Sequence, residues 1–544
     1  MKIHPARLVP TILLLLALLL PASAGASRTQ ESTFQDDNLL VFSPPEQVAK
    51  TMDRLKALGV DRLRISVFWG TVAPTPTAQT RPADFDAANP GAYPPDAWDR
   101  YDTIVRLATE RGLRLNFNLT SPAPFWATDS LPDRPDLDKN FNPNPAEFGA
   151  FAAAVGKRYS GGYVPAKGGP GLPRVDYWTV WNEPNQPGWL TPQWLPDPRK
   201  GGAFVETAPR IYRTLVDGMY SGLIASGHTK DTVLIGETAP KGQKSAKGPT
   251  RALKPGRFIR QLYCLDDNLQ FLKGTSAELR GCPVSNQAAA FAAQHPALFK
   301  ATGYAHHPYE LTFKPTQEPG EDDFTTGNLN ELSSLLRRVY QRYGAPIPGG
   351  QRDLPLYLTE YGYQTDPPDP IGVSLAKQAA YLNEAEFITY RNRRVRTLSQ
   401  FLYNDDVPDP AASNPIAAFG ATFQSGLATS DGTPKKGAIL AYRMPIFVPQ
   451  RKPRKGSRMR VWGMVRPAVN NKRTRVEIHV RSRRGKYKRV KTVAASRGRA
   501  YVDTKIKPRR SGAVRLVWRD GGETITSRSV SFRLLPAKKR STRR

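Results

Sequence analysis

The sequence predicts a (β/α)8 barrel followed by a small, basic all-β domain that resembles a sandwich. Three observations indicate this fold class. From about residue 34 to residue 445, short apolar runs alternate with longer helical patterns. After Pro445, short alternating runs separated by Gly, Arg and Lys replace them. The charge changes at the same place, because residues 451–544 hold 32 Lys and Arg but only four acids, and so carry +28 of the chain's net +32.

The N-terminal residues 1–26 have the layout of a secretory signal peptide. Lys2, His4 and Arg7 precede the apolar run "TILLLLALLL", and the small residues at 22–26 offer a cleavage site. The run is short for a membrane span, which is the alternative, and no later segment is apolar enough to cross a bilayer. We therefore expect a secreted, extracellular protein with no transmembrane span after signal removal.

The barrel is predicted over residues 27–447. Helical spacing of apolar residues predicts helices at 46–58, 96–111, 145–159 and 204–226. Strands alternating with helices form a parallel sheet, and eight such units over roughly 400 residues fit a closed barrel. A doubly wound sheet is the alternative, but no glycine-rich phosphate loop follows the first strand. The predicted strands are residues 37–42, 63–69, 113–119, 177–181, 232–237, 301–307, 355–360 and 397–403.

The C-terminal part divides into three predicted segments. Residues 448–457, "VPQRKPRKGS", are charged and contain proline, as is typical of a linker. Residues 458–535 contain short alternating runs such as "RVEIHVRS" and "AVRLVWR", which predict a small antiparallel β-sandwich. The basic tail at 536–544 is predicted to be disordered.

Two glutamates stand at the ends of predicted barrel strands, where barrel enzymes place their active sites. Glu183, in "VWNEPN", follows the fourth strand, and Glu360, in "LTEYG", follows the seventh. Strands four and seven lie on different sides of the barrel mouth, so the two carboxylates can face each other. Hydrolysis of a glycosidic bond requires such a pair. Glu237, which ends the fifth strand, is the alternative candidate and could also line the site.

These residues resemble the motifs of the retaining glycoside hydrolases that have (β/α)8 barrels and catalytic glutamates after strands four and seven. "WNEP" is similar to the fourth-strand motif of that superfamily, and "LTEYG" to its seventh-strand motif. "RISVFW" at 64–69 and "HHPY" at 306–309 resemble its second-strand and sixth-strand patterns. The resemblance implies a glycosidase that cleaves β-O-glycosidic bonds of an oligo- or polysaccharide by double displacement, with neither metal nor organic cofactor.

The resemblance also implies individual roles. Glu183 would be the acid/base and Glu360 the nucleophile, with Asn182 on the sugar's 2-hydroxyl. Arg64 would keep Glu360 ionised, and His307 and Tyr309 would lie beside the site.

Two candidate sugar contacts depart from the resemblance or go beyond it. The family usually ends strand eight with a tryptophan, where this chain offers Tyr403. Trp126 lies between prolines in a loop that we expect to be exposed, and an aromatic face suits a sugar ring.

Two other functions remain open at this stage. One is a non-catalytic carbohydrate- or cell-wall-binding protein on a barrel scaffold, and the other is a transglycosylase that uses the same glutamates. Retention of Glu183, Glu360, Asn182 and Arg64 together favours an enzyme, because loss of a glutamate marks the non-catalytic proteins.

Cys264 and Cys282 are the two cysteines of the chain. An oxidising compartment favours their pairing, which would stabilise the fold by about 3 kcal/mol for a loop of this size. Two free thiols are the alternative. The spacing resembles no metal-binding motif, so we expect no metal site.

The basic domain indicates attraction to a polyanion. For an exported protein the partner could be an anionic cell-wall polymer, an acidic polysaccharide or a lipid headgroup surface, and cell-wall association would follow. Nucleic acid ranks lower because no nucleic-acid-binding motif is present, and adaptation for solubility is the simplest alternative. We expect the domain to act as a tether that the barrel does not need.

Overall fold

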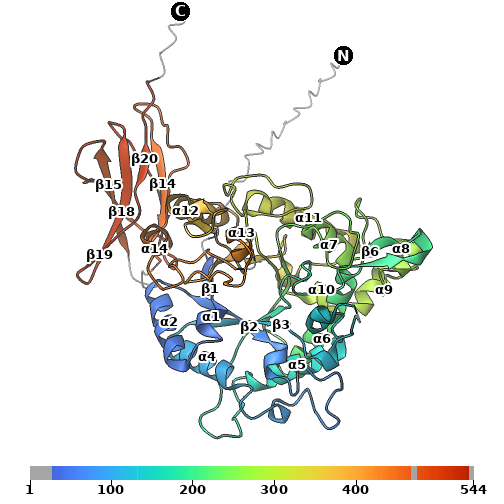
Figure 1. Cartoon of the computed structure of the whole chain (residues 1–544). Helices are drawn as coiled ribbons and strands as arrows, with labels where there is room; N and C mark the ends of the chain where they lie inside the picture. The colour runs from blue at the N-terminus through green and yellow to red at the C-terminus, as the bar shows by residue number, and fades with distance from the viewer. Residues whose placement is uncertain (1–26, 28, 132, 421, 467–473, 538–544) are drawn as a thin grey trace, which may run out of the picture.

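The computed structural model describes residues 27, 29–131, 133–420, 422–466 and 474–537. The predicted signal peptide and residues 538–544 of the predicted tail lie outside the described residues. A ring of helices surrounds a parallel barrel, and a β-rich module lies at one side of it (Figure 1). The predicted fold class is confirmed. Within the described residues, no helix combines the length and the apolar character that a membrane span requires.

Eight parallel strands form the closed barrel in the order β1, β2, β3, β4, β7, β8, β9, β12, and β1 pairs with β12 to complete it. Their interior is close-packed because most strand residues are fully buried. The strands are β1 (Glu31–Gln35), β2 (Arg62–Phe68), β3 (Arg114–Thr120), β4 (Tyr177–Val180), β7 (Thr232–Thr238), β8 (Gly303–His306), β9 (Leu356–Leu358) and β12 (Val395–Phe401).

Each barrel strand is followed by at least one outer helix, which completes the eight units. In α2, for example, Val48, Met52 and Leu55 are buried, so the predicted apolar stripe faces the barrel. The main outer helices are α2 (Pro45–Ala57), α4 (Asp99–Glu110), α5 (Pro145–Arg158), α6 (Ala208–Ala225), α7 (Pro255–Leu262), α11 (Leu329–Tyr343), α12 (Leu375–Tyr390) and α14 (Lys436–Arg443). Shorter helices are α1 (Asp37–Leu40), α3 (Trp69–Val72), α8 (Gly274–Glu278), α9 (Gln287–Gln294), α10 (Ala297–Lys300) and α13 (Pro415–Ala418).

The prediction of the first strand at 37–42 is wrong. The strand is β1, and the apolar residues after it begin the short helix α1, whose N-terminus is capped by Asp36. The Asp36 carboxylate accepts a hydrogen bond from the Leu39 N–H at 3.0 Å, which satisfies one of the free donors of that turn. β1 is largely polar, and it is buried because its side chains have partners inside the barrel.

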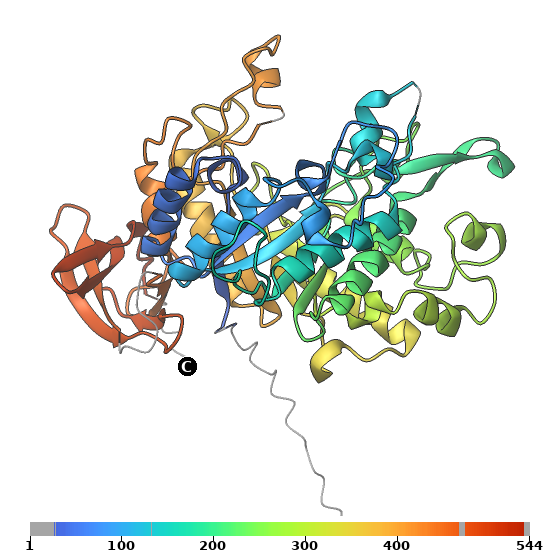
Figure 2. The ribbon, with the colours of Figure 1, turned by 90° about the horizontal axis from the view of Figure 1, so that it is seen from below.

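The predicted helix at 204–226 begins too early. Its first residues belong to β6 (Ala203–Glu206), which pairs with β5 (Trp194–Asp197) in an antiparallel hairpin. This hairpin is inserted between β4 and α6, so the fifth barrel strand carries the label β7. In Figure 2 the hairpin (teal) and the segment around α13 (orange) extend from the barrel as separate projections.

The C-terminal module consists of two antiparallel sheets. One has the order β13, β14, β17, and the other has the order β16, β15, β18, β19, with β20 also paired to β18. Apolar residues of both sheets, such as Val461, Val476 and Leu516, pack into one cluster between them. The strands are β13 (Ile446–Phe447), β14 (Met459–Met464), β15 (Arg475–Ser482), β16 (Lys488–Ala494), β17 (Tyr501–Ile506), β18 (Gly512–Asp520), β19 (Glu523–Thr526) and β20 (Val530–Phe532).

An aromatic contact docks this module against the barrel. Phe387 and Tyr390 of α12 pack with Phe447, Trp462 and Tyr501 of the module in a buried cluster. The interface between the module and the barrel therefore has its own buried cluster. The module packs directly against the barrel, whereas we expected it to be only a tether.

Arg466 connects the two parts at the same interface. Its guanidinium is buried and forms an ion pair with Glu386 of α12 at 2.5 Å. It also donates to Ser32 Oγ of β1 at 2.7 Å and to the Tyr442 carbonyl. A residue of the module thus neutralises a buried carboxylate of the barrel.

The predicted disulfide between Cys264 and Cys282 is present, with a Cα–Cα distance of 5.8 Å. It lies beyond α7, in the segment between β7 and β8.

We expect Arg466→Met to lower the free energy of unfolding by about 3–5 kcal/mol, because it removes one partner of a buried ion pair and leaves Glu386 uncompensated. Urea unfolding measures this change. The exposed Arg458→Met is the matched control and should change stability by less than about 0.5 kcal/mol. Adding Glu386→Leu to Arg466→Met should recover part of the loss, and equal effects of the two single substitutions would contradict this role of Arg466.

Candidate active site

Glu183 is placed by a sharp turn directly after β4. Trp181 and Glu183 both have positive φ angles, of 56° and 35°, which non-glycine residues rarely adopt. The turn is held by the Asn182 N–H, which donates to Thr120 Oγ1 at 3.0 Å, and by Asn185, whose amide bridges to the backbone of Ala239 and Leu253. Backbone strain of this kind persists where the surroundings fix it, as at functional sites.

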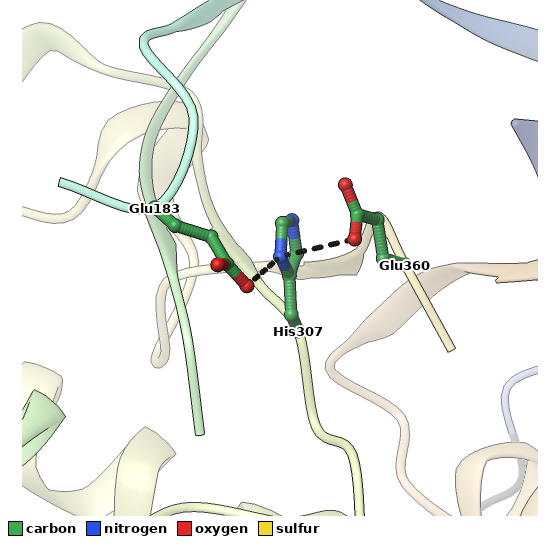
Figure 3. A group of neighbouring side chains, drawn as sticks. All are labelled: Glu183, His307 and Glu360. Atoms are coloured by element: carbon green, nitrogen blue, oxygen red, sulfur yellow. Dashed lines mark hydrogen bonds and ion pairs between the residues drawn. The ribbon is translucent and has the colours of Figure 1, made fainter. Parts of the chain in front are cut away.

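Glu360 follows β9, the seventh strand around the barrel, and faces Glu183 across the mouth. Figure 3 shows the two carboxylates on opposite sides of the His307 ring. One carboxylate oxygen of each glutamate and a ring nitrogen of His307 all lie within 4.8 Å of one another. The side chains are 19% exposed for Glu183 and 9% for Glu360, so both can be reached from the mouth.

Arg64 holds the ends of four other strands from its position inside β2. Its guanidinium donates to Glu360 Oε1 at 3.0 Å, to Glu237 Oε2 at 2.9 Å and to Asn182 Oδ1 at 2.6 Å. It also donates to Gln35 Oε1 at the end of β1. These bonds fix Asn182 and Glu360 relative to each other.

His307 lies between all three glutamates. Nδ1 lies 2.8 Å from Glu183 Oε1 and 3.5 Å from Glu360 Oε2, and Nε2 lies 2.5 Å from Glu237 Oε2. Burial alone would lower the pKa of His307, but the carboxylates of Glu360, Glu183 and Glu237 raise it to about 10. The ring is therefore protonated at neutral pH and donates from both nitrogens.

Two carboxyl groups of this cluster are shifted in opposite directions. Burial raises the pKa of Glu360, with His307 and Arg64 opposing the effect. For Glu237 burial acts in the same direction, but Arg64 and His307 outweigh it and lower the pKa. Three carboxyl groups face two cations here, so one proton held among them makes the cluster neutral.

Tyr309 completes the surroundings of Glu360. Its hydroxyl donates to Glu360 Oε2 at 3.0 Å. Burial and the nearby Glu360 raise the pKa of this hydroxyl well above its usual value, so it stays a donor. The structure thus brings together Glu183, Glu360, Asn182, Arg64, His307 and Tyr309, all of which the sequence had singled out.

Glu237, the alternative candidate, lies behind the pair. It is fully buried, pairs with Arg64 and His307, and accepts from Thr359 Oγ1 at 2.9 Å. The strand pairing shifts its register between Gly236 and Thr238, which turns this carboxylate inward. It does not line the cavity above the pair, so it acts as the counter-ion of the two cations.

A cavity of about 480 Å3 opens above Glu183 and Glu360. Aromatic residues surround it, among them Phe42 and Phe423, which are 53% and 45% exposed. Polar groups complete its walls. The lining includes Asn182, Gln186, Trp189, Lys241, Tyr309, Phe401 and Phe423.

The predicted exposed position of Trp126 is wrong. Trp126 is 9% exposed, its Nε1–H donates to the Pro74 carbonyl at 3.0 Å, and its ring packs edge-on against Trp69 and Phe85. It does not line the cavity. The flanking prolines shape a packed turn, so the ring contributes to the core.

Tyr403 is also turned away from the site. Leu402 has a φ of 70°, and this reverses the chain after β12, so that Tyr403 packs against Phe34 and beneath the Arg54 guanidinium of α2. Phe401, two residues earlier, lines the cavity instead and contacts Tyr309 and Phe423.

Sequence reasoning missed several lining residues. Phe401 is the last residue of β12 and could have been found by applying the strand-end rule to the correct boundary. Phe42 ends the wrongly predicted strand at 37–42 but was not considered, and Phe423 lies in a connecting segment that no motif marks. Trp189, in the segment after Glu183, also lines the cavity.

Comparisons with known proteins give structural matches only. No protein-family model matches the sequence. No curated protein matches it either.

Solved structures with a similar chain course include exo-β-1,4-mannosidase Op5Man5 from Opitutaceae bacterium strain TAV5, at 16% identity and a TM-score of 0.40, covering 76% of this chain and 60% of that one. GH5_18 from Streptomyces cattleya, in complex with GlcNAc, has 15% identity and a TM-score of 0.41, with 77% and 81% covered. Family 1 β-glucosidase from Thermotoga maritima has 12% identity and a TM-score of 0.41, with 73% and 85% covered. Similarity at this level does not define a function.

The protonated state of His307 predicts a pH dependence of stability. Its pKa in the folded protein is about 10, above the ordinary 6.5, so its contribution is complete below about pH 6.5 and is lost as the pH rises toward 10. The difference in unfolding free energy between the wild type and His307→Gln should therefore shrink over that range. Denaturant unfolding at a series of pH values measures it, and a difference that stays constant from pH 6.5 to 10 would show that His307 is neutral when folded.

Proposed function

We propose that this protein is a glycoside hydrolase that cleaves β-O-glycosidic bonds by a retaining double-displacement mechanism. The observation that carries the proposal is the position of Glu183 and Glu360. They come from the ends of strands four and seven, and one carboxylate oxygen of each lies within 4.8 Å of one of the other on the floor of a cavity. Retaining glycosidases have carboxyl groups about 5–5.5 Å apart, whereas inverting enzymes need about 6.5–9.5 Å to admit a water molecule.

In the first step Glu360 attacks the anomeric carbon and Glu183 protonates the leaving oxygen. The glycosidic C–O bond breaks as the bond to Glu360 forms, and the proton of Glu183 leaves with the alcohol. Arg64 and Tyr309 each donate to one oxygen of Glu360, which fixes its orientation. Asn182 Oδ1 is held by Arg64, so its NH2 group is the part available to the sugar's 2-hydroxyl.

In the second step water replaces the enzyme on the sugar. Glu183, now ionised, takes a proton from a water molecule, which attacks the anomeric carbon and releases Glu360. His307 contacts Glu183 and, more distantly, Glu360. Its positive charge can therefore stabilise Glu360 when that carboxylate is ionised before the first step, and Glu183 when it is ionised before the second. Apart from the substrate and the attacking water molecule, both steps use only side chains of the protein.

The walls of the cavity favour a sugar chain as the substrate. Trp189, Phe401 and Phe423 offer apolar faces to sugar rings, and Gln186 and Asn182 offer hydrogen bonds to hydroxyl groups. Several aromatic faces around one mouth suit an oligo- or polysaccharide better than a single sugar.

We also propose that the protein is exported. The signal-peptide pattern of residues 1–26 supports this, and so does the disulfide between Cys264 and Cys282, because disulfides persist in oxidising compartments.

Substitution of the two glutamates should separate their roles. Glu360→Ala should abolish turnover of every substrate. Glu183→Ala should lower kcat/KM by roughly 10²–10⁴ for aryl β-glycosides with poor leaving groups, but much less for dinitrophenyl glycosides, which need no protonation. Azide should restore turnover in Glu183→Ala and form a β-glycosyl azide. Steady-state kinetics on a panel of aryl β-glycosides measure these effects.

The exposed Glu318→Ala provides the matched control and should leave kcat/KM unchanged. If Glu360→Ala stays active while Glu237→Ala does not, the assignment of the nucleophile is wrong. If the wild type binds polysaccharides but hydrolyses no glycoside of the panel, the protein is a binding protein.

The anomeric configuration of the product tests the mechanism directly. Because two inversions restore the starting configuration, proton NMR should show the β-anomer of the released sugar first, before mutarotation. The α-anomer appearing first would show inversion, in which a single displacement by water replaces the glycosyl-enzyme.

A further inference from the structure

A second hollow lies in the C-terminal module, far along the chain from the catalytic glutamates. It has a volume of about 1580 Å3 and is lined by residues of β14, β15, β16 and β17 and of the segment after β17. β16 is the edge strand of one sheet and β17 the edge strand of the other. The Lys491 ammonium of β16 joins these edges by donating to Thr504 Oγ1 at 2.7 Å and to the Lys505 carbonyl at 3.2 Å. The hollow is therefore a groove along an open side of the sandwich.

This groove concentrates positive charge. Nine of its 16 lining residues are Lys or Arg, and one, Asp503, is acidic. Asp503 is already paired with Arg460 at 2.5 Å. Seven of the cations are exposed and form no ion pair with any carboxylate of the described residues, and six of these, all except Lys491, also make no side-chain hydrogen bond there. These six are Arg458, Lys488, Lys505, Lys507, Arg509 and Arg510.

The uncompensated cations converge on one groove, although they repel one another. Lys505, Lys507, Arg509 and Arg510 follow each other along β17 and its extension, and Lys488 comes from the facing edge strand. Cations that serve only solubility need no such convergence. A row of like charges in a concave surface raises the local concentration of a polyanion.

The shape and lining of the groove decide which polyanion fits. A concave groove accommodates a chain, whereas a lipid surface is flat and needs cations on a protruding face. Single-stranded nucleic acid is held by stacking on aromatic side chains, and the described lining of this groove contains none. Thr504 and Ser482 can bond hydroxyl groups, which favours a chain of sugars.

We propose that this groove binds a linear anionic polysaccharide, with carboxylate or sulfate groups on its sugars. Its anionic groups would pair with the six free cations, and its hydroxyl groups would reach Thr504 and Ser482. The site is separate from the catalytic cavity and does not depend on the function proposed for it.

The competing explanation is that the charges only protect exposed strand edges. Lys and other charged residues on edge strands prevent pairing with another sheet. In that case the cations would contribute to binding only through the net charge of the module, and their place within it would not matter.

Two triple variants of the full chain with equal charge change separate these explanations. The groove variant carries Lys505→Glu, Lys507→Glu and Arg509→Glu. The control variant carries Lys452→Glu, Lys455→Glu and Arg533→Glu, all exposed residues of the same module that do not line the groove. Fluorescence anisotropy with labelled polygalacturonate, which carries carboxylates, and labelled dextran sulfate measures binding near 0.15 M salt, with neutral dextran as the blank. Thermal unfolding verifies that both variants fold.

We expect the groove variant to bind at least one of the two anionic chains about tenfold or more weakly than the wild type, and the control variant to bind it within about threefold. Preference for one of them identifies the anionic group. An equal loss in both variants, or no binding by the wild type, would overturn the proposal. So would tighter binding of a single-stranded oligonucleotide, or of anionic vesicles, than of either polysaccharide. If the groove variant does not fold, Lys507→Ala and Arg509→Ala replace it, with Lys452→Ala and Lys455→Ala as their control.

Discussion

The buried guanidinium of Arg64 is the constraint on which the barrel and its site depend. A cation removed from water inside a protein is destabilising by several kcal/mol unless acceptors surround it. Here the acceptors come from Gln35, Asn182, Glu237 and Glu360, each at or just beyond the end of a different barrel strand. One side chain thus imposes polar residues on four strands and sets the distances between them. The positions of these side chains are well defined, because another arrangement around Arg64 would leave a buried charge unpaired.

His307 and Glu237 form a second layer of the same design. Glu237 is completely buried and forms ion pairs with Arg64 and His307 on the side away from the cavity. Arg64 and His307 therefore do not depend only on the two glutamates at the cavity surface for their counter-charges. The cations therefore retain charge to offer Glu183 and Glu360 as protons move. Sharp turns support the arrangement: Trp181 and Glu183 lie in strained conformations that Thr120 and Asn185 hold in place.

Sequence reasoning found the barrel and most of the charged cluster, and its errors have physical causes. Glu183 and Glu360 could be found because a carboxylate directly after an apolar strand is unusual and because strand order fixes which ends meet. β1 was missed because its polar residues are buried by partners that only the folded chain brings together, such as Arg64 for Gln35. Tyr403 was misplaced because a single positive φ at Leu402 reverses the direction of the next side chain. Trp126 was misplaced because prolines mark a turn but do not say whether it is covered.

The docking of the C-terminal module through Trp462, Tyr501 and Arg466 determines what an attached polymer could present to the barrel. When a binding module is attached through a flexible linker, the catalytic domain samples a wide volume around the bound polymer. The effective concentration of the catalytic domain at any one bond of that polymer is then modest. Here the aromatic cluster and the ion pair with Glu386 hold the module, and with it the groove, against the barrel that carries the cavity. The distance and the angle between them are therefore set by the core. A chain held in the groove could therefore offer the catalytic cavity only those glycosidic bonds that lie at one fixed distance from the groove. Bonds at other distances along the chain would stay out of reach.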